Sequence, residues 1–209
     1  MKKGCMIIGL TGQSGSGKST VSKMLKKAGL YIIDADEIAR NVVADNDLCR
    51  SLIMQNFPLA VKGGEIDRKA LADIVFNDKD KLYLLNRITH PFIIYETLHK
   101  ISVLKYDKSI KYIVFDAPQL FESGANAFCD YIISVVAYKE TRLKRIIERD
   151  LITLEEAKAR VSSQLDMTFL MKSSDFVLRN DDDINSLAEK VLSMLAFEFN
   201  IETEIDDIL

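Results

Sequence analysis

The sequence predicts an α/β fold in which a parallel sheet of about five strands is flanked by helices. Short apolar runs recur along the chain, segments with helical spacing alternate with them, and the first run leads directly into a glycine-rich loop. Short apolar runs bounded by turn or charge signals are typical of buried parallel strands. A strand that enters a glycine-rich turn and then a helix is a common building unit of such sheets.

The individual elements follow from these patterns. We expect strands over residues 6–10, 30–33, 112–115, 131–137 and 176–178. The first helix shows apolar residues at helical spacing from Val21 onward and has a natural end at Gly29. A second apolar stripe runs through residues 143–151, and Thr153 with Glu156 forms a capping box that begins the next helix.

The chain is expected to be one domain with two additions to its core. Residues from about 45 to 105 show helical periods and no convincing strand, which predicts a helical insertion between the second and third strands. We expect the core over about 1–44, 106–138 and 173–209, and a helical lid over about 139–172. The acidic tail from residue 197 to 209 is expected to be a solvated or fraying end.

Composition narrows the classes of function. Of 209 residues 48% are apolar and 28% are charged, which suits a globular protein with a sizeable core. Lys and Arg number 28 against 31 Asp and Glu, so no global charge favours nucleic acid. Lys2 and Lys3 precede an apolar run too short for a secretory signal, and no other segment could span a bilayer. We expect a cytoplasmic protein with no nucleic-acid or membrane partner, a monomer for which self-association is left open.

The loop after the first expected strand carries the clearest chemical signal. Its sequence GQSGSGKS matches the phosphate-binding pattern G-x-x-x-x-G-K-[S/T] in full. Glycines let successive backbone N–H groups turn inward around an anion, and the following helix adds the positive end of its dipole. Lys18 can reach the β- and γ-phosphates, and the Ser19 hydroxyl can bind Mg²⁺. The expected ATP-binding residues are Gly12, Ser14, Gly15, Ser16, Gly17, Lys18, Ser19 and Thr20.

Carboxylates follow two of the expected strands. Asp116 ends the run from residue 112 and has the form of a carboxylate near Mg²⁺, with a strand-capping Asp as the alternative. Asp34 and Asp36 follow the second strand, which we expect beside the first. Ligands of open α/β sheets gather at the carboxyl ends of the strands, so one or both carboxylates should face the γ-phosphate. There they could accept a hydroxyl proton or hold Mg²⁺ through water, while a helix N-cap is the alternative role for each.

Positive charge for the transferring phosphoryl group is expected from a basic helix. Arg142, Arg145 and Arg149 are spaced i, i+3 and i+7, so they share one face of a helix whose other face is apolar. A solvated basic face is the usual explanation of such spacing. After a phosphate loop and a carboxylate strand, the pattern also has the form of a closing lid whose arginines clamp phosphates and exclude water. We predict that Arg142 and Arg145 are catalytic, and Arg160 could contribute from the next helix.

Taken together, these segments resemble one family, the dephospho-coenzyme A kinases. The phosphate loop and Asp34-Ala-Asp36 are followed, in the order of that family, by further motifs. These are EIDRKALADIVF, ITHPFI, DAPQLFESG, RLKRIIERD, RVSSQ and SDFVLRN. The resemblance covers the chain up to about residue 195. The phosphate loop is shared by many enzymes, whereas the insertion with D-R-x-x-L-x-x-x-V-F and then H-P is much more specific.

The resemblance implies ATP-dependent phosphorylation of the ribose 3′-hydroxyl of dephospho-coenzyme A, the last step of coenzyme A synthesis. It implies that Asp36 is the base, that the insertion binds the acceptor, that the arginine helix is the lid, and that Asn180 lies by the adenine. The chain departs from the family pattern at Gln13 and Ser14, where glycine and isoleucine are usual, and in lacking the glycine two residues after Asn180.

Two alternatives stay open beside this interpretation. Another nucleoside or nucleotide kinase would use the same phosphate chemistry with a different acceptor. A regulatory NTPase belongs to a different class, and the sequence contains neither an N-K-x-D base-reading motif nor a D-x-x-G switch after Asp116. His90 and Pro91 are expected to form a structural turn rather than to take part in the chemistry.

Overall fold

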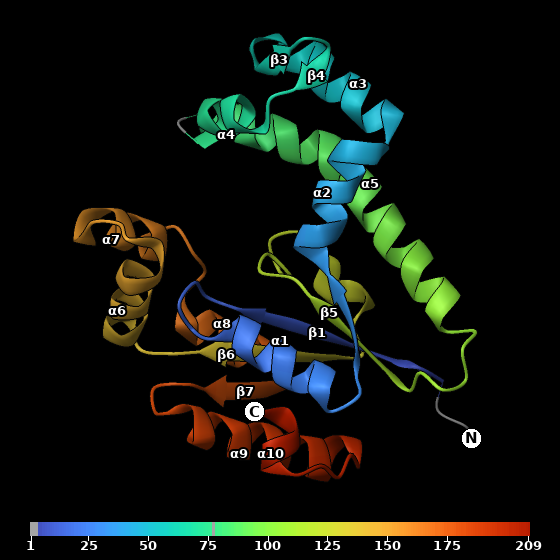
Figure 1. Ribbon diagram of the computed structural model, residues 1–209, viewed down its shortest axis with the longest axis vertical. Coiled ribbons are helices and arrows are strands. Elements are labelled where there is room, and N and C mark those ends of the chain that lie inside the picture. The colour runs from blue at the N-terminus through green and yellow to red at the C-terminus, as the bar shows by residue number, and fades with distance from the viewer. Residues whose placement is uncertain (1–3, 77) are drawn as a thin grey trace. The chain divides into compact units, whose positions relative to one another are not determined.

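The computed structural model describes residues 4–76 and 78–209 of the chain, so Lys2 and Lys3 lie outside the described residues. The chain forms two compact units (Figure 1). The first contains the described residues up to Ile33 together with Asp107–Leu209, and the second contains the described residues of Asp34–Tyr106. The second unit thus begins at Asp34, whereas the insertion was expected from about residue 45.

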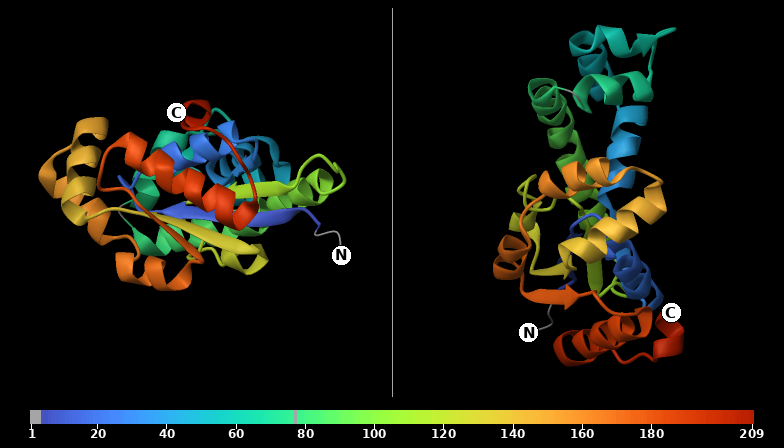
Figure 2. Two further views of the ribbon diagram at one scale, coloured as in Figure 1. Left: turned by 90° about the horizontal axis from the view of Figure 1, so that it is seen from below. Right: turned by 90° about the vertical axis from the view of Figure 1, so that its left-hand side faces the viewer.

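The first unit is built on a five-stranded parallel sheet, which confirms the expected fold class. Helices lie on both faces of the sheet (Figure 2). The strands are β1 (Met6–Gly12), β2 (Tyr31–Asp34), β5 (Tyr112–Asp116), β6 (Tyr131–Val136) and β7 (Phe176–Arg179), in the spatial order β2-β5-β1-β6-β7. Each expected strand is present, with ends that differ by one or two residues.

The order of the strands corrects one expectation. We expected β2 beside β1, but β5 lies between them. Strands consecutive in sequence are usually neighbours, yet the chain leaves the sheet after β2 for the whole second unit before it returns as β5. In the resulting register Leu10 of β1 lies opposite Asp116 of β5. The carboxylate that ends β5 is therefore placed directly beside the start of the phosphate loop.

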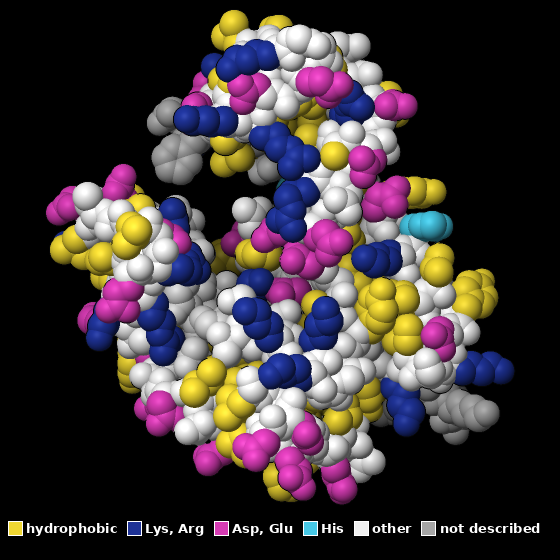
Figure 3. Space-filling view, viewed as in Figure 1, with side chains coloured by type: hydrophobic (Ala, Val, Ile, Leu, Met, Phe, Trp, Pro, Cys, Tyr) yellow, Lys and Arg dark blue, Asp and Glu magenta, His cyan; other side chains and the backbone are white. Residues whose placement is uncertain are grey.

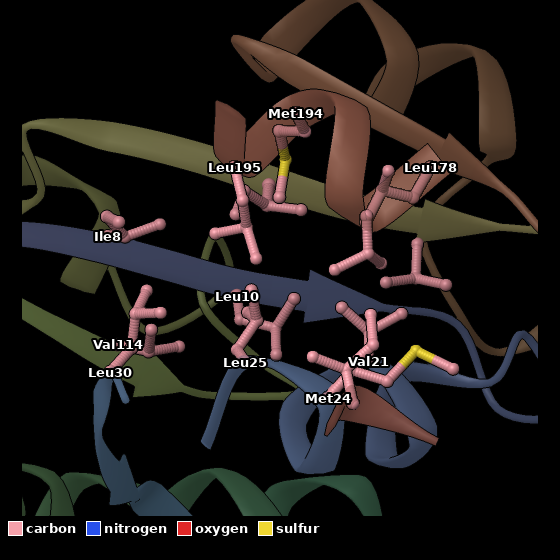
Figure 4. Packing of buried hydrophobic residues seen from close by; sticks show 14 of the residues in the cluster. Ile8, Leu10, Val21, Met24, Leu25, Leu30, Val114, Leu178, Met194 and Leu195 are labelled. Atoms are coloured by element: carbon pink, nitrogen blue, oxygen red, sulfur yellow. The ribbon is translucent and has the colours of Figure 1, made fainter. Parts of the chain in front are cut away.

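A large hydrophobic core of this unit lies between one face of the sheet and helices α1 (Lys18–Lys27), α9 (Ile184–Phe199) and α10 (Ile205–Ile208) (Figure 4). Alternate residues of a strand share a face, so Ile8 and Leu10 of β1 both point into this core. Val21 and Leu25 of α1 pack against them, and all four are fully buried. Burying each such side chain stabilises the fold by about 1.5–3 kcal/mol, which fixes the strand and helix that flank the phosphate loop.

The C-terminal tail is packed against this core, so the expectation of a fraying end was wrong. Phe199 is 3% exposed and Ile208 is 1% exposed. The apolar residues Phe199, Ile201, Ile205 and Ile208 are interspersed with acids, and the acids masked this spacing in the sequence. The acidic side chains face solvent and gather over the C-terminal helices at the lower edge of Figure 3.

The expected helix boundaries of the first unit are confirmed. Gly29 follows the end of α1 with φ 89°, a left-handed conformation that suits a helix stop. Thr153 and Glu156 form the capping box at the start of α7 (Leu154–Ser162). Helices α6 (Lys139–Asp150), α7 and α8 (Met167–Ser173) make up most of the segment expected to be the lid.

The second unit consists mainly of helices, as expected for the insertion. They are α2 (Ala35–Asp45), α3 (Asp47–Asn56), α4 (Arg68–Phe76) and α5 (Lys79–Leu104), with a 3₁₀ turn η1 (Pro58–Ala60). A small antiparallel hairpin was missed: β3 (Val61–Lys62) and β4 (Glu65–Ile66) pair across Gly63 and Gly64, both of which have positive φ. Each of these strands has two residues, which is too few to give a periodic signal in the sequence.

Pro91 does not end a helix, so the turn expected at His90 and Pro91 was wrong. Helix α5 runs through Pro91 without interruption. The Thr89 hydroxyl donates to the Leu85 carbonyl at 3.0 Å one turn earlier, and Thr89 is buried. Helix α5 packs against α2, α3 and α4, and tertiary packing of this kind can outweigh the low helix propensity of proline. Of the helices in the described part of the chain, none is both long enough and apolar enough to cross a membrane.

Candidate nucleotide-binding site

The phosphate loop joins β1 to α1 in a conformation that requires glycine at two positions. Gly15 has φ 80°, and Gly17, the N-cap of α1, has φ 96°. Residues with a Cβ rarely adopt these left-handed angles. The Ser16 N–H donates to the Gln13 carbonyl at 3.0 Å within the loop. The loop therefore has the tight, glycine-dependent turn that the motif predicts, at the N-terminus of a helix.

Neighbouring elements approach this loop too closely for larger residues. A Cβ at Gly12 would lie 2.7 Å from the Val135 carbonyl oxygen of β6. A Cβ at Gly17 would lie 2.1 Å from Nδ2 of Asn180, which follows β7. Both distances are shorter than van der Waals contact permits, so these two glycines are required by close packing as well as by the motif.

Lys18 and Asp116 form an ion pair at the mouth of the loop. The Nζ of Lys18 donates to Oδ1 of Asp116, and the side chains are 18% and 8% exposed. Lys18 begins α1 and Asp116 ends β5, so two elements 98 residues apart in sequence supply one site. The structure thus brings together the cation predicted to bind phosphate and the carboxylate predicted to lie near the metal.

The oxygen donors at this position fit Mg²⁺. Mg²⁺ prefers oxygen ligands and is usually held by one or two protein oxygens together with substrate phosphates and water. Ser19, exposed in the first turn of α1, offers a hydroxyl, and Asp116 offers a carboxylate. Within residues 4–76 and 78–209 there is no group of three His, Cys, Asp or Glu side chains that could hold a metal alone. A hydroxyl and a carboxylate are donors that suit Mg²⁺ when phosphate oxygens and water complete its coordination.

Two arginines of α6 contact the loop itself. Arg142 is 3% exposed; its Nε donates to the Ser14 carbonyl at 3.0 Å and its Nη2 donates to Oε1 of Gln164 at 2.6 Å. Arg145 donates through Nη1 to the Asn180 carbonyl at 2.8 Å and to the Gly15 carbonyl at 3.4 Å. Both residues thus lie at the phosphate loop and contact its backbone, whereas the sequence analysis expected them to contact phosphates. Their expected role on the phosphoryl oxygens stays a prediction.

Two glutamines, Gln13 and Gln164, make side-chain contacts at the loop that the sequence did not predict. Oε1 of Gln164, besides accepting from Arg142, accepts the Ser14 N–H at 3.1 Å. The Gln13 side chain donates to the Leu165 carbonyl at 2.7 Å. Gln164 lies in the RVSSQ motif, but a glutamine 150 residues from its partner gives no local signal of this contact.

Asn180 lies at the loop with a different contact from the expected one. Its Nδ2 donates to the Ser16 carbonyl at 2.7 Å, and the residue is 7% exposed. Its own N–H donates to the Val136 carbonyl, which fixes the end of β7 against β6. The expectation that Asn180 lies by the adenine stays a prediction.

The carboxylates at the start of α2 belong to the second unit and have different roles there. Asp34 is the N-cap of α2: its Oδ1 accepts the N–H groups of Asp36 at 2.8 Å and Glu37 at 3.1 Å. Asp36 is exposed in the first turn of the same helix. The capping role considered for Asp34 is therefore present, and Asp36 follows it as an exposed residue of the first turn.

Comparison with known proteins relates this site to one family. The family model described as dephospho-CoA kinase matches residues 6–186. A dephospho-CoA kinase of Fusobacterium nucleatum is 44% identical over 188 residues, which cover 89% of this chain and 95% of the relative. A dephospho-CoA kinase of Carboxydothermus hydrogenoformans is 39% identical over 191 residues, with coverage of 90% and 92%.

Solved structures agree with the sequence comparisons. A dephospho-CoA kinase from Campylobacter jejuni is similar with a TM-score of 0.67 and 34% identity, over 90% of this chain and 94% of that one. A shikimate kinase from Acinetobacter baumannii has a TM-score of 0.54 at 14% identity and shares the fold alone. Since the family model spans most of the chain and includes the phosphate loop, Asp116 and Arg142, the chain belongs to the dephospho-CoA kinase family.

Proposed function

We propose that the phosphate loop binds the Mg²⁺–ATP of the dephospho-CoA kinase reaction and that this chain phosphorylates the ribose 3′-hydroxyl of dephospho-CoA. Dephospho-CoA kinase activity, the final step of CoA biosynthesis, is the activity of the family to which the chain belongs. The products are CoA and ADP. The observation that supports the site assignment most directly is the Lys18–Asp116 pair at a complete phosphate loop.

The ion pair indicates what each partner does when nucleotide binds. The Lys18 ammonium can exchange its carboxylate partner for β- and γ-phosphate oxygens, which carry more negative charge and lie at the same loop. The Asp116 carboxylate then becomes available to Mg²⁺ or to a water bound to it, with the Ser19 hydroxyl as a second ligand. When bound, the metal supplies charge stabilisation for the phosphate oxygens. The protein residues supply binding and orientation.

In the transfer step the acceptor hydroxyl oxygen forms a bond to the γ-phosphorus while the bond from that phosphorus to the bridging oxygen of ADP breaks. The hydroxyl proton goes to a base, and we assign this role to Asp36. Its exposed position in the first turn of α2, together with the capping of that turn by Asp34, supports the assignment. Proton transfer by a positioned carboxylate contributes typically about 10²–10⁴-fold to the rate.

Charge that develops on the transferring group requires stabilisation by fixed donors. Lys18 and the N–H groups of the phosphate loop provide it, and preorganised groups of this kind usually contribute the largest part of the acceleration. We assign recognition of the acceptor to the helical segment of about residues 45–105, and closure over the nucleotide to the segment of about residues 139–172. A cytoplasmic location and a monomeric state stay predictions.

The test is ADP release by the purified protein with Mg²⁺–ATP, with and without dephospho-CoA, together with the mass of the product. Acceptor-dependent ADP and a product heavier by one phosphoryl group are expected. Turnover with another nucleoside or nucleotide acceptor, but not with dephospho-CoA, would contradict the assignment of the acceptor. Hydrolysis stimulated by a protein partner, without any small-molecule acceptor, would favour a regulatory NTPase.

A further inference from the structure

Three consecutive carbonyls of the phosphate loop are each held by a side chain from another element. The Ser14 carbonyl accepts from Nε of Arg142 at 3.0 Å, and the Gly15 carbonyl accepts from Nη1 of Arg145 at 3.4 Å. The Ser16 carbonyl accepts from Nδ2 of Asn180 at 2.7 Å. The donors come from α6 and from the residue after β7, between 128 and 164 positions away in sequence. We call this side of the loop its outer side.

Holding these carbonyls sets the direction of the N–H groups that bind phosphate. In a trans peptide the carbonyl and the following N–H point in opposite directions from one rigid plane. The planes after Ser14 and Ser16, held by their carbonyls on the outer side, therefore direct the N–H groups of Gly15 and Gly17 toward the inner side. The N–H of Ser16 donates to the Gln13 carbonyl within the loop. An inward row of N–H groups is what makes such a loop an anion site.

Packing on the outer side supports the same conclusion independently. A Cβ on Gly15 would lie 2.8 Å from the Arg142 carbonyl oxygen, and one on Gly17 would lie 2.1 Å from Nδ2 of Asn180. The segment of the loop whose carbonyls accept these hydrogen bonds is thus also in van der Waals contact with α6 and Asn180.

Arg142 also lacks a compensating charge. It is 3% exposed, and in the part of the chain that the structure describes no carboxylate forms an ion pair with it. Burial lowers the pKa of the Arg142 guanidinium from its ordinary value, but arginine stays charged in proteins. A buried positive charge satisfied only by neutral acceptors costs free energy unless an anion binds nearby. This cost is offset when phosphate occupies the loop.

We propose that Arg142, Arg145 and Asn180 are positioning residues that hold the phosphate loop from its outer side in the phosphate-binding conformation, before nucleotide arrives. This inference rests on the proposed role of the loop as the ATP site. It assigns to Arg142 and Arg145 an action through the loop instead of contact with the transferring group, and to Asn180 an action that does not involve the base.

Asn180 gives the sharpest test because it is neutral and because inorganic tripolyphosphate has no adenine. We expect Asn180→Ala to weaken tripolyphosphate and ATP to a similar extent, about tenfold each, because one hydrogen bond to a buried carbonyl is lost. The kcat at saturating ATP should change less than about twofold, because the saturated loop is organised by its ligand. Calorimetry and steady-state kinetics measure these values, and Asn185→Ala, at an exposed position of α9, is the matched control.

The outcomes separate the proposal from its rivals. Unchanged tripolyphosphate affinity with an altered preference between ATP and GTP would make Asn180 an adenine contact and overturn the proposal. A fall in kcat at saturating ATP with unchanged affinities would indicate a role on the transition state, and would equally overturn it. Binding of dephospho-CoA should not change. If the wild-type enzyme used a different acceptor, the proposed function would fail while the tripolyphosphate result would still judge this inference.

A second variant covers the case in which Asn180→Ala does not fold. Arg145 is half-buried, and Arg145→Ala should let the loop open in the protein without nucleotide. Hydrogen exchange of the Ser16 amide should then become about tenfold faster. Lys144→Ala, an exposed residue of the same helix, should leave that exchange unchanged. Unaltered exchange in nucleotide-free Arg145→Ala would show that the arginine acts only on bound phosphate, and would reject the proposal.

Discussion

The phosphate loop and the start of α2 both supply residues to the proposed reaction, and they are built in opposite ways. Lys18 and Asp116 are 98 residues apart, and the Ser16 carbonyl is held by a side chain 164 residues away. At the start of α2, Asp34 accepts from amides two and three residues further along. The loop residues Gly12 and Ser16 are buried, whereas Asp36 is exposed.

This difference predicts how each region tolerates change. A loop whose conformation depends on distant partners should lose nucleotide affinity, and in places stability, when one contact is removed. Replacing the exposed carboxylate Asp36 should mainly lower turnover, because the cap of its helix is supplied by Asp34 and stays in place. The effects below test this contrast.

Lys18→Met should have the largest effect. It removes the ammonium that binds the β- and γ-phosphates and should lower kcat/KM about 10³-fold or more. It also leaves the Asp116 carboxylate buried without its cation, which destabilises the fold. Adding Asp116→Asn should restore the melting temperature but not the activity. Lys26→Met, at an exposed position of the same helix, is the control for loss of a lysine.

A Lys18→Met enzyme with ordinary kcat/KM would contradict the site assignment altogether. In that case a lowered melting temperature would leave Lys18 only a structural role as the partner of Asp116.

Asp36→Asn should lower kcat about 10²-fold while the KM for ATP and the melting temperature change little. The effect should be specific to this position. The matched control is Asp34→Asn, which removes a neighbouring negative charge but keeps the helix capped, because asparagine caps a helix as well as aspartate does. Equal losses of kcat in the two variants would mean that negative charge at this helix start matters more than a proton acceptor. A change in ATP affinity without a change in kcat would remove Asp36 from the chemistry.

Gly17→Ala should raise the Kd for ATP about tenfold, since alanine disfavours the left-handed φ by about 1–2 kcal/mol. The added Cβ would also displace Asn180 from its place beside the loop. Calorimetry with ATP and with inorganic tripolyphosphate should give the same loss. Gly63→Ala, in a hairpin of the second unit with open space around it, shares the positive φ and controls for it. An ATP affinity that survives Gly17→Ala would show that the loop adapts, contrary to the contrast drawn above.

The same contrast explains what the sequence could and could not predict. The loop glycines, Lys18 and Asp116 were identified because each belongs to a short pattern with a fixed chemical meaning. The place of β5 between β2 and β1, and the contact of Gln164 with Ser14, depend on how distant segments return to the sheet. No local pattern carries that information. The alternative capping role of Asp34 could be stated in advance because capping is local.

The packed C-terminus was missed for a different reason. The apolar residues of this tail pack in or against the core, but the acidic residues between them dominate the composition of the segment. Charge on the solvent side of a helix does not argue against burial of its other side. The composition averaged over the segment therefore predicted a solvated end, although the positions of the individual apolar residues indicated burial.

The smallest expected effect concerns Asp150, which links two helices of the expected lid. Hydrogen bonds and ion pairs with Arg149, and then with Arg160 of α7, hold the pKa of this carboxyl at about 2, below its ordinary 3.8. A depressed pKa contributes stability that is present above the ordinary value and is lost as pH falls toward 2. Asp150→Asn should therefore lower the melting temperature slightly at pH 7, and the difference from wild type should narrow below about pH 4. Glu148→Gln, exposed on the same helix, should show no such narrowing. A difference for Asp150→Asn that stays constant as the pH falls would mean that the asparagine disturbs packing of α6 against α7, so that the charge of Asp150 would not be what joins them.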